Sequence, residues 1–387
     1  MRKLIIGVLP VVLLVLLIAS FLQFGPLGLL KTAFPPVETV AFEKVVLEKD
    51  KIAVSIINDG PDEVTISQVL INDAYNQFHI TQSTLKHLEK AVIYLEYPWS
   101  EMLPLRIKLV SSSGVTFEKE IPVATPTPVP DSRYIISFAL IGLYVGVIPV
   151  FLGLLWLPLL KNLSRRWYDF FLSLTVGLLI FLLIDALEGA FELAAEIPQT
   201  LQGVSLIAIG VFLPYLTLLA IGKKDSIDAD NKSAISHTLR LSYMISLAIG
   251  LHNMGEGLAI GSAFSVGEIT LGSLLVIGFM MHNVTEGIAI IAPIAKQKGE
   301  NTLKHLLTLG LIAGGPTIIG AWIGGFVFSQ LWSLLFLSVG VGAILYVVVE
   351  IVKFMKRDAP TTIFTFTNIA GFLSGLFIMY VTGLFVF

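Results

Sequence analysis

The chain has 387 residues, of which 55% are hydrophobic and only 14% are charged. Soluble domains carry about one-quarter charged residues, so this composition cannot cover a water-facing surface and predicts a membrane protein. The net charge of −3 gives no basis for nucleic-acid binding, and the absence of cysteine excludes disulfides and thiolate metal sites.

The first predicted element is an apolar run from Leu4 to Phe24, preceded by Arg2 and Lys3. The apolar part of a signal peptide is usually about 7–15 residues long, and no clear Ala-x-Ala cleavage site follows this run. For residues 1–30 we therefore prefer an uncleaved transmembrane anchor over a signal peptide. Either interpretation places the next segment outside the cytoplasm.

Residues 35–124 differ in character from the rest of the chain. Short β-prone runs alternate with turn sequences such as Asn58 to Pro61. Six or seven short strands in about 90 residues predict a small β-sandwich of Ig-like size. Residues 125–132 are rich in proline and predict a stiff linker. The sequence leaves open whether this β-domain is a lid, a dimer contact, a partner-binding module or a spacer, and it is compatible with a homodimer.

Residues 133–387 are almost continuously apolar and predict an all-helical domain with eight membrane spans. The predicted spans cover about residues 134–160, 168–195, 203–222, 235–264, 268–295, 303–328, 331–354 and 362–387. Lysine and arginine follow every odd-numbered span, whereas the connections after the second, fourth and sixth spans contain neither. By the positive-inside rule, this alternation predicts a multi-pass protein of the cytoplasmic membrane, with the β-domain and the C-terminus outside.

Two copies of one motif, His-Asn-x-x-Glu-Gly, lie in the fourth and fifth spans. One begins at His252, and the other begins 30 residues later at His282. Residues four apart share one face of a helix, so each histidine and its glutamate point the same way. The asparagine lies about 100° further round the helix. The predicted ligands are therefore His252, Glu256, His282 and Glu286, accompanied by Asn253 and Asn283.

Two such helices facing each other would bring two imidazoles, two carboxylates and two amide oxygens together. This set suits divalent ions such as Zn²⁺, Fe²⁺, Mn²⁺ or Cd²⁺. A single intramembrane histidine is often only a packing residue. A glutamate in mid-span, however, costs at least about 2.5–3.5 kcal/mol, and two of them at the same offset from histidine favour a metal site. The glycine after each glutamate predicts a close approach of helices.

The motif pair resembles that of the ZIP (Zrt/Irt-like) metal transporters, in the prokaryotic branch whose fourth helix reads His-Asn-x-Pro-Glu-Gly. The resemblance covers about residues 134–387. It implies an eight-helix bundle, a metal site midway across the bilayer and a shift of the site-bearing helices against the others. Carried over by position, the two histidines and two glutamates form the primary site, and the asparagines face a second, adjacent one.

The sequence departs from the family pattern at three positions. Gly255 and Thr285 stand where the family has a helix-kinking proline before each glutamate, and Gly315 precedes Pro316 where the sixth helix often has Glu-Pro. Without that carboxylate, we expect one strong ion site rather than two.

Three further acids are candidates for the entry or exit pathway. Asp185 and Glu188 resemble an acidic segment near the family's outer mouth, although a solvated helix end would explain them equally well. Glu350 lies where the resemblance implies an exit-side acid, but Lys353 is near enough in sequence to pair with it.

Three functions follow from these patterns. The leading hypothesis is a non-enzymatic transporter that moves a divalent metal ion, zinc first, across the lipid bilayer towards the cytoplasm. An intramembrane hydrolase is disfavoured because the His-Glu-x-x-His signature is absent. A metal sensor or binding protein without transport is the alternative, and it would show equilibrium binding with no flux.

Overall fold

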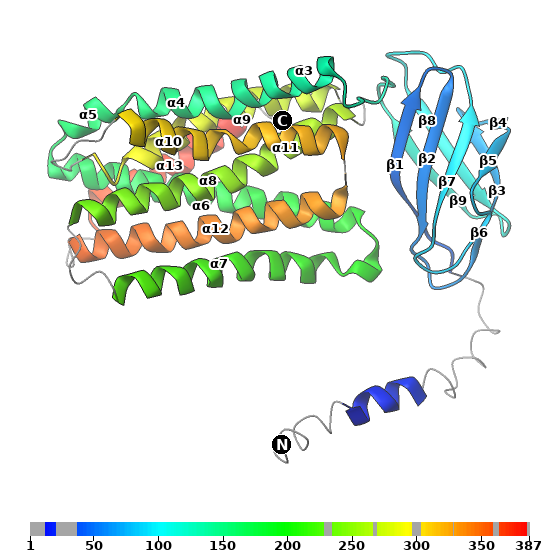
Figure 1. The fold of residues 1–387 in the computed structure, drawn as a ribbon, viewed down its shortest axis with the longest axis horizontal. Helices are drawn as coiled ribbons and strands as arrows, with labels where there is room; N and C mark the ends of the chain where they lie inside the picture. Colours follow the sequence, from blue (N-terminus) through cyan, green and yellow to red (C-terminus); the bar gives the residue numbers. More distant parts are fainter. Residues whose placement is uncertain are drawn as a thin grey trace.

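The computed structural model describes residues 12–20, 37–227, 234–265, 269–295, 303–327, 329–358 and 364–384. A β-domain lies at one end of a bundle of long helices (Figure 1). The predicted N-terminal anchor falls mostly outside the described residues. Its described part, residues 12–20, is helical and exposed.

The β-domain is made of short antiparallel strands. Those described are β1 Val40–Glu48, β2 Lys51–Asn58, β3 Val64–Ile71, β4 Ala74–Asn76, β5 Phe78–Ile80, β6 Thr84–Leu85, β7 Lys90–Glu96, β8 Leu105–Ser111 and β9 Thr116–Ile121. They form two sheets, ordered β1-β2-β7-β5 and β4-β3-β8-β9, with β6 paired to β3. Alternate side chains of both sheets, among them Ile56, Ile93 and Ile107, enclose one aliphatic core. The prediction of a small antiparallel β region is confirmed.

Helices dominate the described chain after the β-domain. They are α3 Ser132–Gly142, the π-helix η2 Leu143–Val147, α4 Ile148–Leu154, α5 Leu157–Lys161, α6 Arg165–Glu196, the 3₁₀ turn η3 Gln199–Leu201, α7 Gly203–Ile227, α8 Ala234–Ser265, α9 Ile269–Ile291, α10 Leu303–Gly314, α11 Pro316–Phe326, α12 Gln330–Asp358 and α13 Phe366–Gly383.

Within the described residues, seven helical segments are long and apolar enough to cross a membrane. They are Ser132–Lys161, Arg165–Ala195, Gln199–Ala220, Leu271–Ile291, Leu303–Phe326, Gln330–Lys356 and Phe366–Gly383. The chain is therefore a multi-pass helical membrane protein that carries a β-domain, as predicted at this level.

Helix α8 is long but is not one of these seven segments. It has 32 residues, and it contains Arg240, His252 and Glu256 together with several serines, which lower its hydropathy. It packs against α9, α10, α11 and α12. The helix that bears the first motif copy is therefore packed against four other helices.

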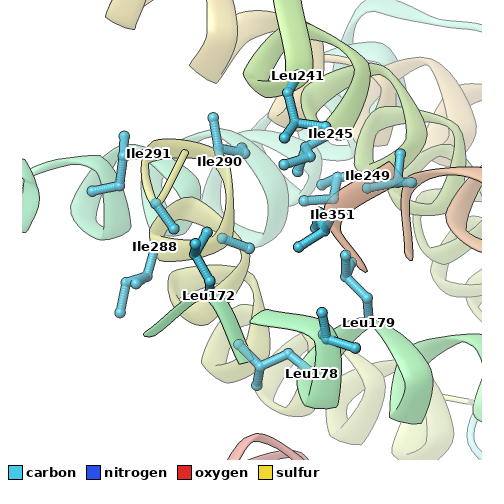
Figure 2. Close-up of a cluster of buried hydrophobic side chains, with 14 of the residues drawn as sticks. Leu172, Leu178, Leu179, Leu241, Ile245, Ile249, Ile288, Ile290, Ile291 and Ile351 are labelled. Atoms are coloured by element: carbon cyan, nitrogen blue, oxygen red, sulfur yellow. The ribbon is translucent and has the colours of Figure 1, made fainter. Parts of the chain in front are cut away.

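The helices associate in two groups. One group contains α3, η2, α4 and α8 to α11, and the other contains α6, α7, α12 and α13, with the α8–α12 contact as the main connection between them. A cluster of aliphatic side chains fixes this connection. In Figure 2, Leu241, Ile245 and Ile249 of α8 point into a cluster shared with Leu179 of α6 and Ile351 of α12.

The glycine that follows each motif glutamate lies at a close helix contact. A Cβ atom at Gly257 of α8 would lie 2.1 Å from the carbonyl oxygen of Thr317 on α11. A Cβ atom at Gly287 of α9 would lie 2.3 Å from the carbonyl oxygen of Val150 on α4. No larger residue fits without moving a backbone, so the predicted close approach at both glycines is confirmed.

Two connections hold the β-domain against the bundle. In the proline-rich linker, Thr127 N donates to the Leu47 carbonyl at 2.9 Å, and Leu47 N donates to Thr127 Oγ1 at 2.8 Å. The Asp131 side chain then caps α3. Between α6 and α7, Gln199 N donates to Asp59 Oδ2 at 3.0 Å. The first part of the linker is thus bonded to strand β1, and the β-domain itself contacts the turn between α6 and α7.

Candidate metal centre

The four predicted ligands meet inside the bundle. His252 and Glu256 come from α8, and His282 and Glu286 come from α9. Their exposed fractions are only 3%, 3%, 5% and 4%, respectively. One ligand atom from each side chain can be chosen so that all four atoms lie within 4.8 Å of one another. We call these four residues the quartet.

Glu256 joins the two motif copies. Its Oε1 atom lies 2.5 Å from Nε2 of His282 and 3.2 Å from Nε2 of His252. His282 is on the other helix, α9, and His252 is on the same helix as Glu256, one turn earlier. Both imidazoles therefore present Nε2 to the middle of the quartet.

Each asparagine binds the glutamate of the other copy. Asn253 Nδ2 donates to Glu286 Oε2, and Asn283 Nδ2 donates to Glu256 Oε2, both at 3.0 Å. This reciprocal pairing orients the two carboxylates, in the way that supporting hydrogen bonds usually orient metal ligands.

The asparagine amides are in turn anchored to backbone carbonyls. Asn253 Nδ2 also donates to the Ala313 carbonyl at 3.2 Å, and the second asparagine donates likewise to the Val145 carbonyl at 3.0 Å. Ala313 lies in the last turn of α10, three residues before Pro316. The final carbonyls of a helix have no partner within that helix. Val145 lies in η2, four residues before Pro149, which has no N–H to offer it.

These two carbonyls are the parts of the site that sequence reasoning missed. For Val145 the signal was Pro149, four residues later, because proline has no N–H to donate to that carbonyl. Pro316 follows Ala313 by only three residues, so it interrupts the helix near that carbonyl without marking it. The π-helical turn at η2 has no comparable sequence mark.

Several polar atoms of these side chains are buried and have no hydrogen-bond partner among the described residues. They are Glu286 Oε1, Asn253 Oδ1, Asn283 Oδ1 and His252 Nδ1. Buried polar atoms are normally paired. Exchanging O and N of the asparagine amides does not help, because the groups facing each Nδ2 are all acceptors. Unpartnered oxygens beside carboxylates and imidazoles fit a divalent cation.

The two motif helices are uninterrupted at the residues before their glutamates. α8 runs through Gly255 and α9 runs through Thr285 without a break. The hydroxyl of Thr285 donates to the His282 carbonyl at 2.6 Å. A break falls instead between α10 and α11, at Gly315, and the carbonyl of Ala313 just before it accepts from Asn253.

The acids predicted for the pathway lie in different surroundings. Asp185 on α6 is outside the quartet but interacts electrostatically with His252, His282 and Glu256. Glu188, one turn later, lines an open cavity of about 500 Å³ together with Ile184, Leu187, Phe191 and Glu192. The two acids thus extend from the neighbourhood of the site along α6.

Glu350 on α12 is not brought to the quartet. Its Oε1 atom accepts a hydrogen bond from Lys353 Nζ at 2.7 Å. Of the two readings that the sequence left open, the structure shows the ion pair.

No family model matches the chain, and the search of curated proteins finds no match. Among solved structures, the archaellum periplasmic stator protein FlaG from Sulfolobus acidocaldarius is similar, at 15% identity and a TM-score of 0.19. That match covers 22% of this chain and 99% of the other. A likeness of this strength identifies neither the fold nor the function of the chain.

Proposed function

We propose that this chain is a ZIP-like transporter that carries a divalent metal ion across the cytoplasmic membrane, towards the cytoplasm, by way of the quartet. Zinc is the first candidate, followed by iron, manganese and cadmium. One observation carries the proposal. Two copies of the same motif, on two different helices, bring two histidines and two glutamates within 4.8 Å of one another in a buried position.

The donor chemistry supports a divalent cation as the substrate. Two imidazole nitrogens and two carboxylates form a borderline set that Zn²⁺ accepts readily. Two buried carboxylates are costly unless opposite charge compensates them, and a divalent ion supplies that charge. Because imidazole and carboxylate must give up protons to bind, uptake and release of the ion would exchange protons.

The proposed topology adds α8 as the fourth of eight spans. Successive spans then run in opposite directions, and the β-domain lies at the end where α3 begins (Figure 1). Lys161, Arg165, Lys304 and Lys353 lie at helix ends that this alternation places at the opposite end. By the positive-inside rule, the basic end faces the cytoplasm and the β-domain faces outward.

Transport further requires that the site open to each side in turn. The division of the helices into two groups supports a movement of the site-bearing group, with α8 and α9, against the group of α6, α7, α12 and α13. The α8–α12 contact is where such a movement would occur.

Flux into sealed vesicles tests the proposal. Vesicles that contain the purified chain and a trapped metal-sensitive dye should take up Zn²⁺, Mn²⁺ or Fe²⁺ faster than empty vesicles. The double variant His252→Ala with Glu286→Ala should match empty vesicles. Glu118→Gln, which removes a surface carboxylate of the β-domain, is the control and should leave uptake intact.

Two other outcomes would replace the proposal. Tight metal binding by the quartet without flux of any of the three ions would make the chain a metal-binding protein or sensor. Flux that survives the double variant would place the pathway elsewhere in the bundle.

A further inference from the structure

Helix α8 carries two serines whose hydroxyls are buried and unpartnered. Ser242 and Ser246 are both 0% exposed, and neither Oγ atom has a hydrogen-bond partner in the part of the chain that the structure describes. Buried helical hydroxyls commonly donate to a carbonyl of the preceding turn, as Ser333 of α12 does to Ser329 at 3.0 Å. The two serines of α8 leave that bond unmade, and buried polar atoms of this kind require an explanation.

Both serines lie on the face of α8 that bears Asn253. They precede it by 7 and 11 residues, which at about 100° per residue places them within about 20° on either side of it. Asn253 itself contacts Glu286 of α9 and Ala313 of α10. The serine face therefore continues the metal site along the helices α9 and α10.

This face leads towards the basic end of the bundle. With a rise of about 1.5 Å per residue, Ser246 lies about 10 Å and Ser242 about 16 Å from Asn253 along the helix axis. Both are on the N-terminal side, where Arg240 also lies. The polar stripe thus runs from the quartet to the end of the bundle at which the proposed topology places the cytoplasm.

The second motif copy has no such stripe. Val276 and Gly272 occupy the corresponding positions of α9, 30 residues after Ser246 and Ser242. Because α9 runs opposite to α8, a stripe there would point to the β-domain end. Serines in line with the motif asparagine thus occur before the first copy and not before the second. The repeat of the motif alone does not account for this difference.

Two other buried hydroxyls have no partner among the described residues, those of Thr317 and Ser262. Thr317 is on α11, and a Cβ atom at Gly146 would lie 2.0 Å from its Oγ1, so this hydroxyl is packed against the backbone of η2. Ser262 follows Asn253 by nine residues on α8, which places it about 180° round the helix.

We propose that Ser246 and Ser242 line the route by which the metal ion travels between the quartet and the basic end. The inference rests on the proposed transport function and adds the direction and the residues of the release path. A hydroxyl oxygen is a hard, neutral ligand. It replaces part of the ion's hydration without the charge of a carboxylate, so it lowers the cost of passage without holding the ion.

The absence of cysteine from the chain permits a direct test by cysteine substitution. Ser246→Cys and Ser242→Cys should each react with a small, positively charged, water-soluble thiol reagent in the purified full chain. Ala248→Cys is the matched control, because Ala248 is 1% exposed, lies on the same helix and faces about 140° away from Asn253. It should remain unmodified, and the parent chain serves as the blank.

Modification of the two serine positions no faster than of Ala248→Cys would overturn the proposal. The labelling does not depend on flux, so it separates this inference from the proposed function. A parent that gives no vesicle uptake disproves transport, whereas equal labelling disproves the route.

A second measurement separates passage from binding. The pair Ser246→Ala with Ser242→Ala should keep the zinc affinity of the parent, since the quartet is intact, while vesicle flux falls by roughly tenfold as two hydroxyl contacts to a cation are lost. Ser333→Ala should change neither quantity. Undiminished flux in the double variant would contradict the route.

Discussion

The β-domain and the helix bundle bury their amide side chains in opposite ways. In the β-domain, Asn58 is 0% exposed and fully bonded. Its Nδ2 donates to the carbonyls of Asp62 and Leu85 at 2.7 and 2.9 Å, and its Oδ1 accepts from Gly60 N at 2.9 Å. In the bundle, Asn253 is equally buried and its Nδ2 is also used twice, yet its Oδ1 has no partner among the described residues.

The difference separates a structural amide from one suited to a ligand. A satisfied amide stabilises the turn that it closes. An amide that fixes a carboxylate with its nitrogen and leaves its oxygen free is prepared for a cation. Charges follow the same division, because Asp73 and Lys108 pair on the surface of the β-domain, whereas Glu256 and Glu286 are buried in the bundle.

The largest expected effect is on metal affinity, from removal of Glu256. Its Oε1 atom contacts both histidines and its Oε2 atom accepts from Asn283, so Glu256→Ala removes one ligand and loosens three side chains. Zinc affinity should fall by more than the roughly 10- to 100-fold typical of losing a supporting hydrogen bond. Equilibrium zinc titration of the purified variant checks this. Glu118→Ala, which removes a surface carboxylate of the β-domain, should bind zinc like the parent.

The two buried asparagines should respond differently to the same change. Asn253→Ala should weaken zinc binding by about 10- to 100-fold, because Glu286 loses its support. Asn58→Ala should leave zinc binding unchanged and lower the unfolding free energy by about 1–3 kcal/mol, since buried carbonyls lose their donors. Titration and thermal unfolding of both variants decide the matter. An equal loss of zinc affinity in both variants would show that the two asparagines do not differ in their role.

A smaller effect is expected from the helix contacts beside the site. Gly257→Ala should destabilise the bundle by about 1–3 kcal/mol through overpacking, because its Cβ would lie 2.1 Å from a backbone oxygen. Gly255→Ala is the control two residues earlier, since its Cβ would meet only Leu337, at 3.3 Å from the side chain and 4.0 Å from the Cα atom. That variant should stay within about 1 kcal/mol of the parent, helped by the better helix propensity of alanine. Thermal unfolding in detergent compares the two.

The smallest effect belongs to the surface pair of the β-domain. The hydrogen bond from Lys108 to Asp73, at 3.0 Å, lowers the pKa of the Asp73 carboxyl. The stabilisation from this carboxylate is therefore present above the ordinary aspartate pKa and is lost as the pH falls through the lowered value. Asp73→Asn should cost little at neutral pH, since the pair is exposed, and should reduce the acid sensitivity of unfolding slightly. Zinc binding at neutral pH should not change.

Much of the site could be predicted from sequence because short-range geometry determines it. A histidine and a glutamate four residues apart must share a helix face, and a repeat of the pattern in the next apolar segment predicts that two faces meet. His252, Glu256, His282 and Glu286 do meet. The β region was equally evident, because its alternation and turn sequences are local signals.

The remaining features depend on how helices are aligned with one another, which spacing along one helix does not determine. The crossed pairing of each asparagine with the other copy's glutamate requires a particular register between α8 and α9. The carbonyl of Val145 is indicated only by the proline four residues later, and the carbonyl of Ala313 carries no side-chain signature. For Glu350, sequence allowed both a ligand and an ion pair, and only the folded position of Lys353 distinguishes them.

X-ray absorption spectroscopy of the zinc-loaded protein tests the central claim most directly. The claim predicts one zinc ion coordinated by nitrogen and oxygen, with two imidazoles at about 2.0–2.1 Å. The imidazole signal should fall to one in His252→Ala and equally in His282→Ala. A spectrum with no imidazole contribution, or one that neither substitution alters, would show that the two motif copies do not share an ion.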